Sequence, residues 1–252
     1  MKAAFGSFLL SLRAAARLFS RPQQLTVPMI ALFAIIPGYL VIGAYVSNRT
    51  LHSPALALDH IWPLEPGWSL VYLSLFLAAL LPVFVVHQQE LIRRVVLAYL
   101  FIWLLAYVVF LVYPTAAPAH ADVIGNGFSA VALRTIYGSD VPYNCFPSLH
   151  VAQCFLAAFT CDRVNRGVGF TTGIWASLVA LATLFTKQHY VIDVIGGVLL
   201  AYIAHRVFLG GYAREATPDQ ERKLAPLLAL AAFGLYGLLA AGLWFMYFVA
   251  AT

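Results

Sequence analysis

Seven apolar stretches, each close to the length that crosses a membrane, constrain this chain more than any other feature. They cover roughly residues 25–46, 69–86, 94–113, 147–162, 168–186, 189–208 and 224–250. A helix needs about 20 apolar residues to span the hydrocarbon of a bilayer, and only the fourth stretch is short. Because no water is present there to satisfy the backbone, segments of this length are expected to be helices. The predicted class is an all-α, polytopic helical membrane protein.

Composition agrees with a chain that lies in a bilayer. Hydrophobic residues fill 62% of the 252 positions and charged residues 10%, whereas soluble domains average about 25% charged residues. The mean hydropathy is +0.86. The formal net charge of +5 would suit a nucleic-acid partner if the charge formed one patch. The basic residues lie between the apolar stretches instead, so we expect no nucleic-acid partner and interpret them as topology signals.

The distribution of lysine and arginine predicts the orientation. Twelve of the 15 basic residues belong to the amino-terminal segment and to alternate connections. These are Lys2, Arg13, Arg17, Arg21, Arg93, Arg94, Arg163, Arg166, Arg206, Arg214, Arg222 and Lys223. The opposite side holds Arg49, Arg134 and Lys187. Since cytoplasmic loops carry the excess of basic residues, the amino terminus is predicted inside and the carboxyl terminus outside. A bacterial inner membrane is the expected location.

The chain divides into four predicted parts. Residues 1–22 place Phe5, Phe8 and Leu12 at helical spacing with Arg13 on an adjoining face, which predicts an interfacial amphipathic helix. A cleavable signal peptide is the alternative, but its apolar core would be interrupted by arginine. Residues 23–208 form a six-helix core, residues 209–223 a cytoplasmic linker, and residues 224–252 an additional transmembrane helix.

The longer connections are predicted on the outer side. Residues 47–68 contain Trp62 and Trp68, which are typical of the membrane interface. Residues 114–145 contain a short apolar piece near 128–137, which we expect to lie along the membrane surface. Two polar motifs, one at the start of the fourth stretch and one at the start of the sixth, open on this same side. Any chemistry is therefore expected outside the cytoplasm.

The first motif is Phe146-Pro147-Ser148-Leu149-His150. Pro147 suits the first turn of a helix, because its missing N–H would have no partner there. The N–H groups of Ser148 and Leu149 would then point out of a positive helix end, which is a ready site for phosphate. The hydroxyl of Ser148 adds a donor, and His150 can deliver a proton near neutral pH.

The second motif places His189 four residues before Asp193, so that both share one face of a helix that starts near residue 189. The carboxylate can accept from one ring nitrogen and leave the other as a nucleophile or base. A carboxylate such as Asp193 within an apolar span is functional by default. Lys187, two residues before the histidine, needs an anionic partner at this depth.

Other interpretations remain open at this stage. His150, His189 and Asp193, with His120 as a fourth ligand, could bind a metal, although they lack a short two-histidine signature. Cys145 could be a nucleophile, but such a cysteine is more often a small apolar residue. A proton-coupled transporter would use the same groups as a relay. A non-catalytic lipid-binding protein would keep the fold without turnover.

Pro147-Ser148-x-His150 followed by His189-x-x-x-Asp193 resembles the phosphatidic acid phosphatase type 2 superfamily. The fuller strings, from Tyr113 to Pro118, Phe146 to His150 and Thr186 to Gly196, are similar to the branch that contains the inositol phosphorylceramide synthases. The resemblance implies a lipid phosphatase or phosphotransferase that needs no metal or other cofactor. Its partners would be a lipid phosphate or phospholipid substrate and the membrane lipids.

By this resemblance His189 would attack phosphorus to form a phosphohistidine, with Asp193 orienting its ring. His150 would protonate the leaving oxygen, while Ser148 and the N–H groups around Leu149 would hold the phosphoryl oxygens. Water or an alcohol would then release the phosphoryl group. Hydrolysis is preferred over transfer as the commoner activity of the superfamily.

The chain departs from the superfamily pattern in its cations. The first motif of the family supplies a lysine and an arginine, and residues 105–120 contain neither. Thr183 stands where the family usually has an arginine, and Leu149 where it has a glycine. Lys187 is the first candidate to meet the phosphate charge, followed by Arg134 and His120. Fewer cations favour a phosphodiester, which carries less charge than a monoester.

Overall fold

The structure is a computed structural model that describes residues 34–35, 37–119, 122–140 and 142–251. The predicted interfacial helix over residues 1–22 and the candidate His120 lie outside these residues. Within them the regular structure is helical, and the only β pairing is an isolated bridge between His52 and Thr115. The predicted all-α class is confirmed.

The described elements follow one another with short connections. They are a first helix Pro37–Val46, η1 Ala57–Ile61, η2 Pro66–Trp68, α3 Ser69–Leu73, α4 Leu75–Val85, α5 Gln89–Val112, α6 Phe128–Ser139, α7 Leu149–Asp162, α8 Arg166–Phe185, α9 Val191–Ala204, η3 His205–Leu209, η4 Arg214–Ala216 and α10 Asp219–Ala251.

Helices stand at the described parts of all seven predicted apolar stretches, of which the first is described only from residue 34 and without residue 36. Five are long and apolar enough to cross a membrane: Pro66–Val85, Gln89–Val112, Arg166–Phe185, Val191–Leu209 and Asp219–Val249. Pro37–Val46 and Leu149–Asp162 are apolar but shorter. The chain is an integral membrane protein. Helix α10 begins at Asp219, so the connection predicted over residues 209–223 is shorter than expected.

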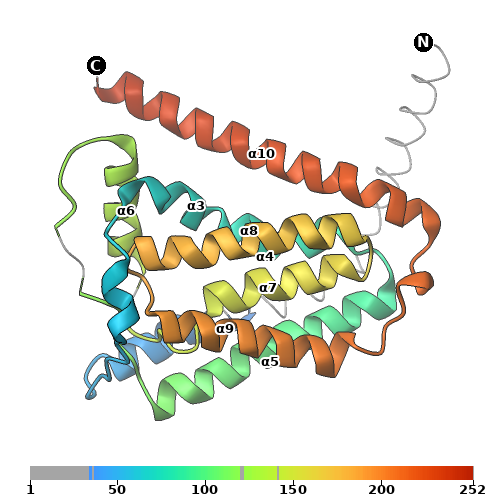
Figure 1. Ribbon diagram of the computed structural model, residues 1–252, viewed down its shortest axis with the longest axis horizontal. Helices are drawn as coiled ribbons and strands as arrows, with labels where there is room; N and C mark the ends of the chain where they lie inside the picture. Colours follow the sequence, from blue (N-terminus) through green and yellow to red (C-terminus); the bar gives the residue numbers. More distant parts are fainter. Residues whose placement is uncertain (1–33, 36, 120–121, 141, 252) are drawn as a thin grey trace.

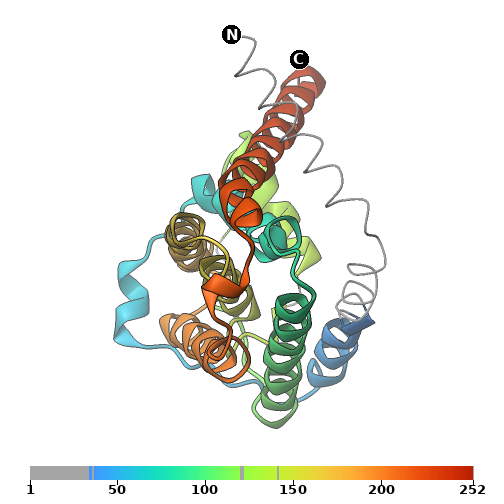
Figure 2. The same ribbon diagram turned by 90° about the vertical axis from the view of Figure 1, so that its right-hand side faces the viewer.

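Helix α7 lies at the centre of the bundle, in contact with α4, α5, α8 and α9 (Figure 2). Its side chains are buried on several faces, including Val151, Cys154 and Leu156, each 0% exposed. A helix that is apolar all round is one that is surrounded by others. Helix α7 has only 14 residues, and its amino-terminal end is covered, since Ser148 is 0% and Leu149 4% exposed.

Helices α7 and α9 approach each other at a glycine. A Cβ atom on Gly197 would lie 2.5 Å from the carbonyl oxygen of Ser148 and 3.1 Å from Cβ of Val151. Only glycine lets the two backbones come this close without displacement. Gly197 therefore sets the distance between the helices that carry the two predicted motifs.

The two ends of the bundle differ in charge. One end holds eight of the described basic residues: Arg93, Arg94, Arg163, Arg166, Arg206, Arg214, Arg222 and Lys223. Several cross-connect the helices there, since Arg94 donates to the carbonyl of Phe208 and Arg214 pairs with Asp162 at 2.8 Å. The opposite end, where α7 and α9 begin, holds both histidine motifs.

Helices α6 and α10 both reach the end of the bundle that holds the histidine motifs. Helix α6, which forms at the apolar piece near residues 128–137, lies across the direction of α7 and α8 (Figure 1). Helix α10 starts at the basic end and passes over α4 and α8. The hydroxyl of Tyr247 near its end donates to the carbonyl of Asn126, just before α6. The carboxyl terminus thus returns to the end of the bundle that holds the histidines.

Candidate active site

The start of α7 is fixed by a serine cap. The side chain of Ser148 accepts from the N–H of Val151 at 3.3 Å, and the helix begins at Leu149. Serine is a preferred N-cap because its oxygen satisfies one of the free N–H groups of the first turn. The expectation that Pro147 occupies that first turn is wrong, since Pro147 precedes the capping residue. Phe146 donates its N–H to Oγ1 of Thr115 at 2.8 Å, which anchors the approach to the helix.

The start of α9 is fixed by Asp193, whose Oδ2 accepts the N–H of Tyr190 at 2.9 Å. The same oxygen lies 3.4 Å from Nδ1 of His189. Helix α9 begins at Val191, so His189 lies two residues before the helix and not within it. Its N–H donates to the carbonyl of Thr183 at 3.2 Å. Backbone and side chain together fix the orientation of the His189 ring.

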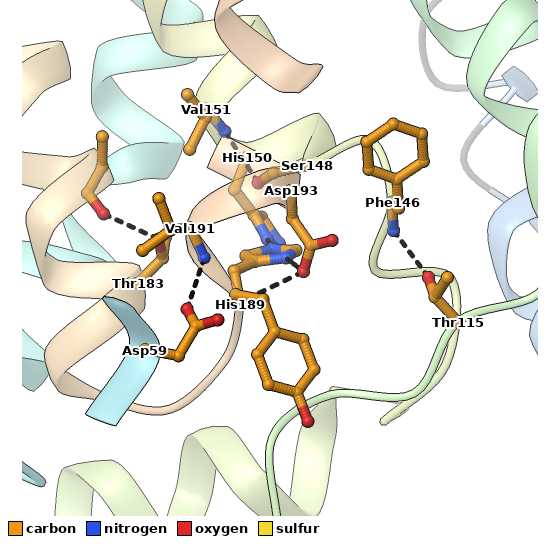
Figure 3. A network of polar contacts seen from close by, with 12 residues as sticks. Asp59, Thr115, Phe146, Ser148, His150, Val151, Thr183, His189, Val191 and Asp193 are labelled. Carbon is orange, nitrogen blue, oxygen red and sulfur yellow. Dashed lines mark hydrogen bonds and ion pairs between the residues drawn. The ribbon is translucent and has the colours of Figure 1, made fainter. Parts of the chain in front are cut away.

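The two histidines meet in space (Figure 3). Nδ1 of His150 lies 3.1 Å from Nε2 of His189. Because Asp193 can only accept at Nδ1 of His189, the proton of that ring belongs on Nδ1 and its Nε2 carries a lone pair. Nδ1 of His150 is then the donor in the contact. His189 is 5% exposed and Asp193 is 0% exposed, so the arrangement is shielded from bulk water.

A second carboxylate lies on the far side of His150. Oδ2 of Asp140, the residue that follows α6, is 3.8 Å from Nε2 of His150. The hydroxyl of Tyr39 donates to Oδ1 and that of Tyr72 to Oδ2, each at 3.1 Å. Sequence reasoning missed this residue, because Asp140 stands in a connection and has no helical spacing to either motif.

The loop before α3 reaches the same place. Asp59 in η1 accepts the N–H of Val191 at 2.7 Å (Figure 3) and that of Leu56 at 2.6 Å. A carboxylate at a helix N-terminus is favoured by the helix dipole. The hydroxyl of Tyr190 bonds to Ser53 at 2.9 Å. This loop closes over the start of α9.

The predicted phosphate-binding residues differ in how they are placed. Ser148 is buried, and its N–H donates to the carbonyl of Asp193 at 3.0 Å. That N–H is therefore already used to join the two motifs. The N–H groups of Leu149 and His150 lie in the first turn of α7, where the helix itself offers them no acceptor. These groups and the hydroxyl hydrogen of Ser148 are the donors that α7 presents next to the histidine pair.

The three basic residues at this end donate to backbone carbonyls. Lys187 donates to the carbonyl of Trp62, and Arg49 to that of Leu111. Arg134 donates to the carbonyls of Val123 and Gly125 at 2.9 and 2.7 Å. The structure thus brings His150, His189, Asp193 and Ser148 together, whereas Lys187 and Arg134 are bound to separate loops.

Other candidate roles can be compared with this geometry. Among the described residues no three histidine, cysteine or acidic side chains are placed to hold a metal ion. Cys145 is buried, and burial, followed by the charges of Asp193 and Asp140, raises the pKa of its thiol well above the usual value. A thiol in such surroundings is a poor nucleophile, because the thiolate is the reactive form.

A family model confirms the relationship that the motifs indicate. The model of the PAP2 superfamily, the type 2 phosphatidic acid phosphatases, matches residues 48–207. The chain belongs to the PAP2 superfamily. The matched range includes both histidines, Asp193 and Asp140. PAP2 membership gives a function of the phosphatase or phosphotransferase type, and members generally act on lipid phosphates. Neither the curated proteins nor the solved structures contain a significant match to the chain.

Proposed function

We propose that this PAP2 protein is a lipid phosphatase or phosphotransferase that works through a phosphohistidine on His189, without a metal ion. The observation that carries the proposal is the row of contacts from Asp193 through His189 to His150. A carboxylate on one ring nitrogen leaves the other nitrogen as a nucleophile, and a second histidine stands where a leaving group needs a proton.

In the first step Nε2 of His189 attacks phosphorus while the bond from phosphorus to the lipid oxygen breaks. That oxygen takes the proton from Nδ1 of His150. Reacting atoms in a productive complex are about 3–3.5 Å apart, so the 3.1 Å nitrogen contact leaves no room for a phosphoryl group between the rings. Substrate must part the two histidines as it enters.

In the second step water or an alcohol attacks the phosphorus of the phosphohistidine. The bond between phosphorus and Nε2 breaks, and the attacking oxygen gives its proton to Nδ1 of His150, which is now neutral. The starting protonation states are then restored. Asp193 balances the charge on the His189 ring throughout, as one of its oxygens lies within 3.4 Å of Nδ1.

The charges at this end favour transfer from a phosphodiester as the second candidate. The observation behind it is that Lys187, Arg134 and Arg49 all donate to carbonyl groups. A monoester dianion would need more positive charge than the N–H groups of α7 supply. A phosphodiester, as used by the inositol phosphorylceramide synthases, carries a single negative charge. Lys187 remains the first candidate to turn from Trp62 toward a phosphate.

We also propose that the histidines face the periplasmic or outer side of a bacterial inner membrane. Eight described lysine and arginine residues gather at the opposite end of the bundle, against three at the histidine end. Such an excess marks the cytoplasmic side. The reactive groups would then meet lipids of the outer leaflet.

The test is product analysis with purified protein in lipid vesicles. Phosphatidic acid, a prenyl phosphate and a phosphodiester lipid are each supplied with ³²P in the phosphoryl group, and wild-type protein is compared with His189→Ala. We expect acid-labile, alkali-stable label on wild-type protein alone, insensitivity to chelators and inhibition by vanadate. Release of inorganic phosphate identifies a phosphatase, and a newly labelled lipid identifies a transferase.

Three results would contradict the proposal. Turnover that survives in His189→Ala excludes the phosphohistidine. Loss of activity with a chelator and recovery with zinc or magnesium excludes the metal-free route. Equal lipid binding by both forms, with no product from any of the three lipids, would instead favour the non-catalytic lipid-binding protein.

A further inference from the structure

The side of His150 that faces away from His189 meets a carboxylate built from three separate segments. Asp140 comes from the end of α6, Tyr39 from the first described helix and Tyr72 from α3. Each tyrosine hydroxyl donates to one carboxylate oxygen, and the Tyr72 ring also packs edge-on against the His150 ring, with centroids 5.5 Å apart. The carboxylate is thus fixed in place beside the imidazole.

Asp140 completes a row of four groups. Asp193 contacts Nδ1 of His189, Nε2 of His189 contacts Nδ1 of His150, and Nε2 of His150 faces Asp140. The last distance, 3.8 Å, is within the range of an ion pair but too long for a hydrogen bond. Both ends of the histidine pair therefore have a carboxylate, although only one lies in a recognised motif.

Substrate entry changes the last distance in a defined direction. A phosphoryl group fits between the histidines only if the 3.1 Å contact opens. Nε2 is on the side of the His150 ring away from His189, so a ring that moves off His189 moves toward Asp140. Catalytic hydrogen bonds are often long without substrate and shorten in the reactive complex.

We propose that Asp140 is the positioning residue of His150: its carboxylate, held by Tyr39 and Tyr72, receives Nε2–H of His150 when substrate parts the two histidines. This inference rests on the proposed function. Asp140 keeps the proton on Nε2 and leaves Nδ1 to exchange protons with the substrate. It also balances the positive charge of His150 before the leaving oxygen takes the proton and after the attacking water or alcohol returns one.

The titratable groups placed against His150 come from three elements. His189 lies on its Nδ1 side, Asp140 on its Nε2 side and Tyr72 against its ring. Of these three groups only Asp140 is a carboxylate, so it is the one that can place a negative charge beside protonated His150. Removal of that charge should therefore lower the pH at which His150 loses its proton.

The experiment compares wild-type protein with Asp140→Asn in vesicles that contain ³²P-phosphatidic acid or the phosphodiester lipid, whichever turns over. The measurement is the pH dependence of kcat, whose alkaline limb reports loss of the protonated acid in the enzyme–substrate complex, where the proposed contact forms. We expect this limb to move to lower pH by about one unit. On that limb, a shift of one unit is about a tenfold loss of kcat.

Two controls distinguish an effect of the Asp140 charge on His150 from an effect of its hydrogen bonds on helix packing. The double variant Tyr39→Phe and Tyr72→Phe removes both hydrogen bonds to Asp140 but keeps its charge, so its alkaline limb should stay or move to higher pH. Asp162→Asn removes a carboxylate that pairs with Arg214 at the other end of the bundle. It should leave the profile unchanged.

Two outcomes would overturn the inference. One is an Asp140→Asn profile that superimposes on the wild-type profile. The other is a double tyrosine variant whose alkaline limb moves to lower pH as far as that of Asp140→Asn. That result would mean that Asp140 only holds the helices together through its hydrogen bonds. Failure of the proposed function is distinct from both, because wild-type protein would then form no labelled phosphohistidine.

Discussion

His150 at the start of α7 and His189 before the start of α9 have carboxylate partners at very different separations along the chain. Asp193 follows His189 by four residues, in the first turn of the helix that His189 precedes. Asp140 precedes His150 by ten residues and belongs to a different helix end. The first pair survives in any chain that forms α9, whereas the second requires α6, α3 and the first helix to be in place. Spacing along the chain therefore predicts Asp193 as a partner of His189, but it does not predict Asp140 as a partner of His150.

The different roles of the two histidines are tested by replacing each of them in turn. His189→Ala should lower turnover by more than about 10⁴-fold, because no nucleophile remains. His150→Gln should lower it by about 10²–10⁴-fold, since only proton transfer is lost. With a p-nitrophenyl leaving group, which needs no proton, His150→Gln should still label His189. Phosphate release and trapped label provide the measurement, and label on His189→Ala would contradict the assignment.

The local carboxylate should matter next. Asp193→Asn can donate to Nδ1 of His189 and so favour the wrong tautomer, which in a comparable histidine–carboxylate pair costs about 10⁴-fold in kcat. We expect a loss on the order of 10³-fold, larger than that of Asp140→Asn. Steady-state kinetics of both variants in the same vesicles measure the difference. An Asp140→Asn protein that is slower than Asp193→Asn would reverse the proposed order of the two partners.

The contact between the two helices can be tested at Gly197. Gly197→Ala would place Cβ 2.5 Å from the carbonyl of Ser148, so α7 and α9 must separate. Overpacking of this kind destabilises by about 1–3 kcal/mol. Thermal unfolding in detergent should show a lower midpoint, together with reduced turnover. Gly173→Ala is the matched control, because its Cβ would meet nothing within 4 Å. Equal midpoints for the two variants would show that α7 and α9 can adjust freely.

The smallest effect is expected at Asp59, which supports α9 from the loop before α3. Asp59→Asn keeps an oxygen for the N–H of Val191 but loses the charge at the helix N-terminus. Charges at this position contribute about 0.3–1 kcal/mol. We expect a slightly lower unfolding midpoint and a change in turnover of only a few-fold. A loss as large as that of Asp193→Asn would indicate that Asp59 contacts the reacting groups directly.

The fold class and the local pairing of His189 with Asp193 could be predicted from the residues alone. The length of the apolar stretches requires helices, because the bilayer leaves no other way to satisfy the backbone. The pairing of His189 with Asp193 depends on neighbours within one turn, so their spacing predicts it. The superfamily follows from these motifs, and the family model confirms it.

Contacts between groups that are distant in sequence depend on how the helices pack. The contact of His150 with His189, the place of Asp140 and the closure of the loop at Asp59 all join segments far apart in sequence. In a membrane the lipid-facing and buried faces of a helix are both apolar, so the pattern does not reveal which face packs. Close approach at single residues such as Gly197 sets the packing instead. The position of Lys187, bound to the carbonyl of Trp62, depends on the same long-range packing.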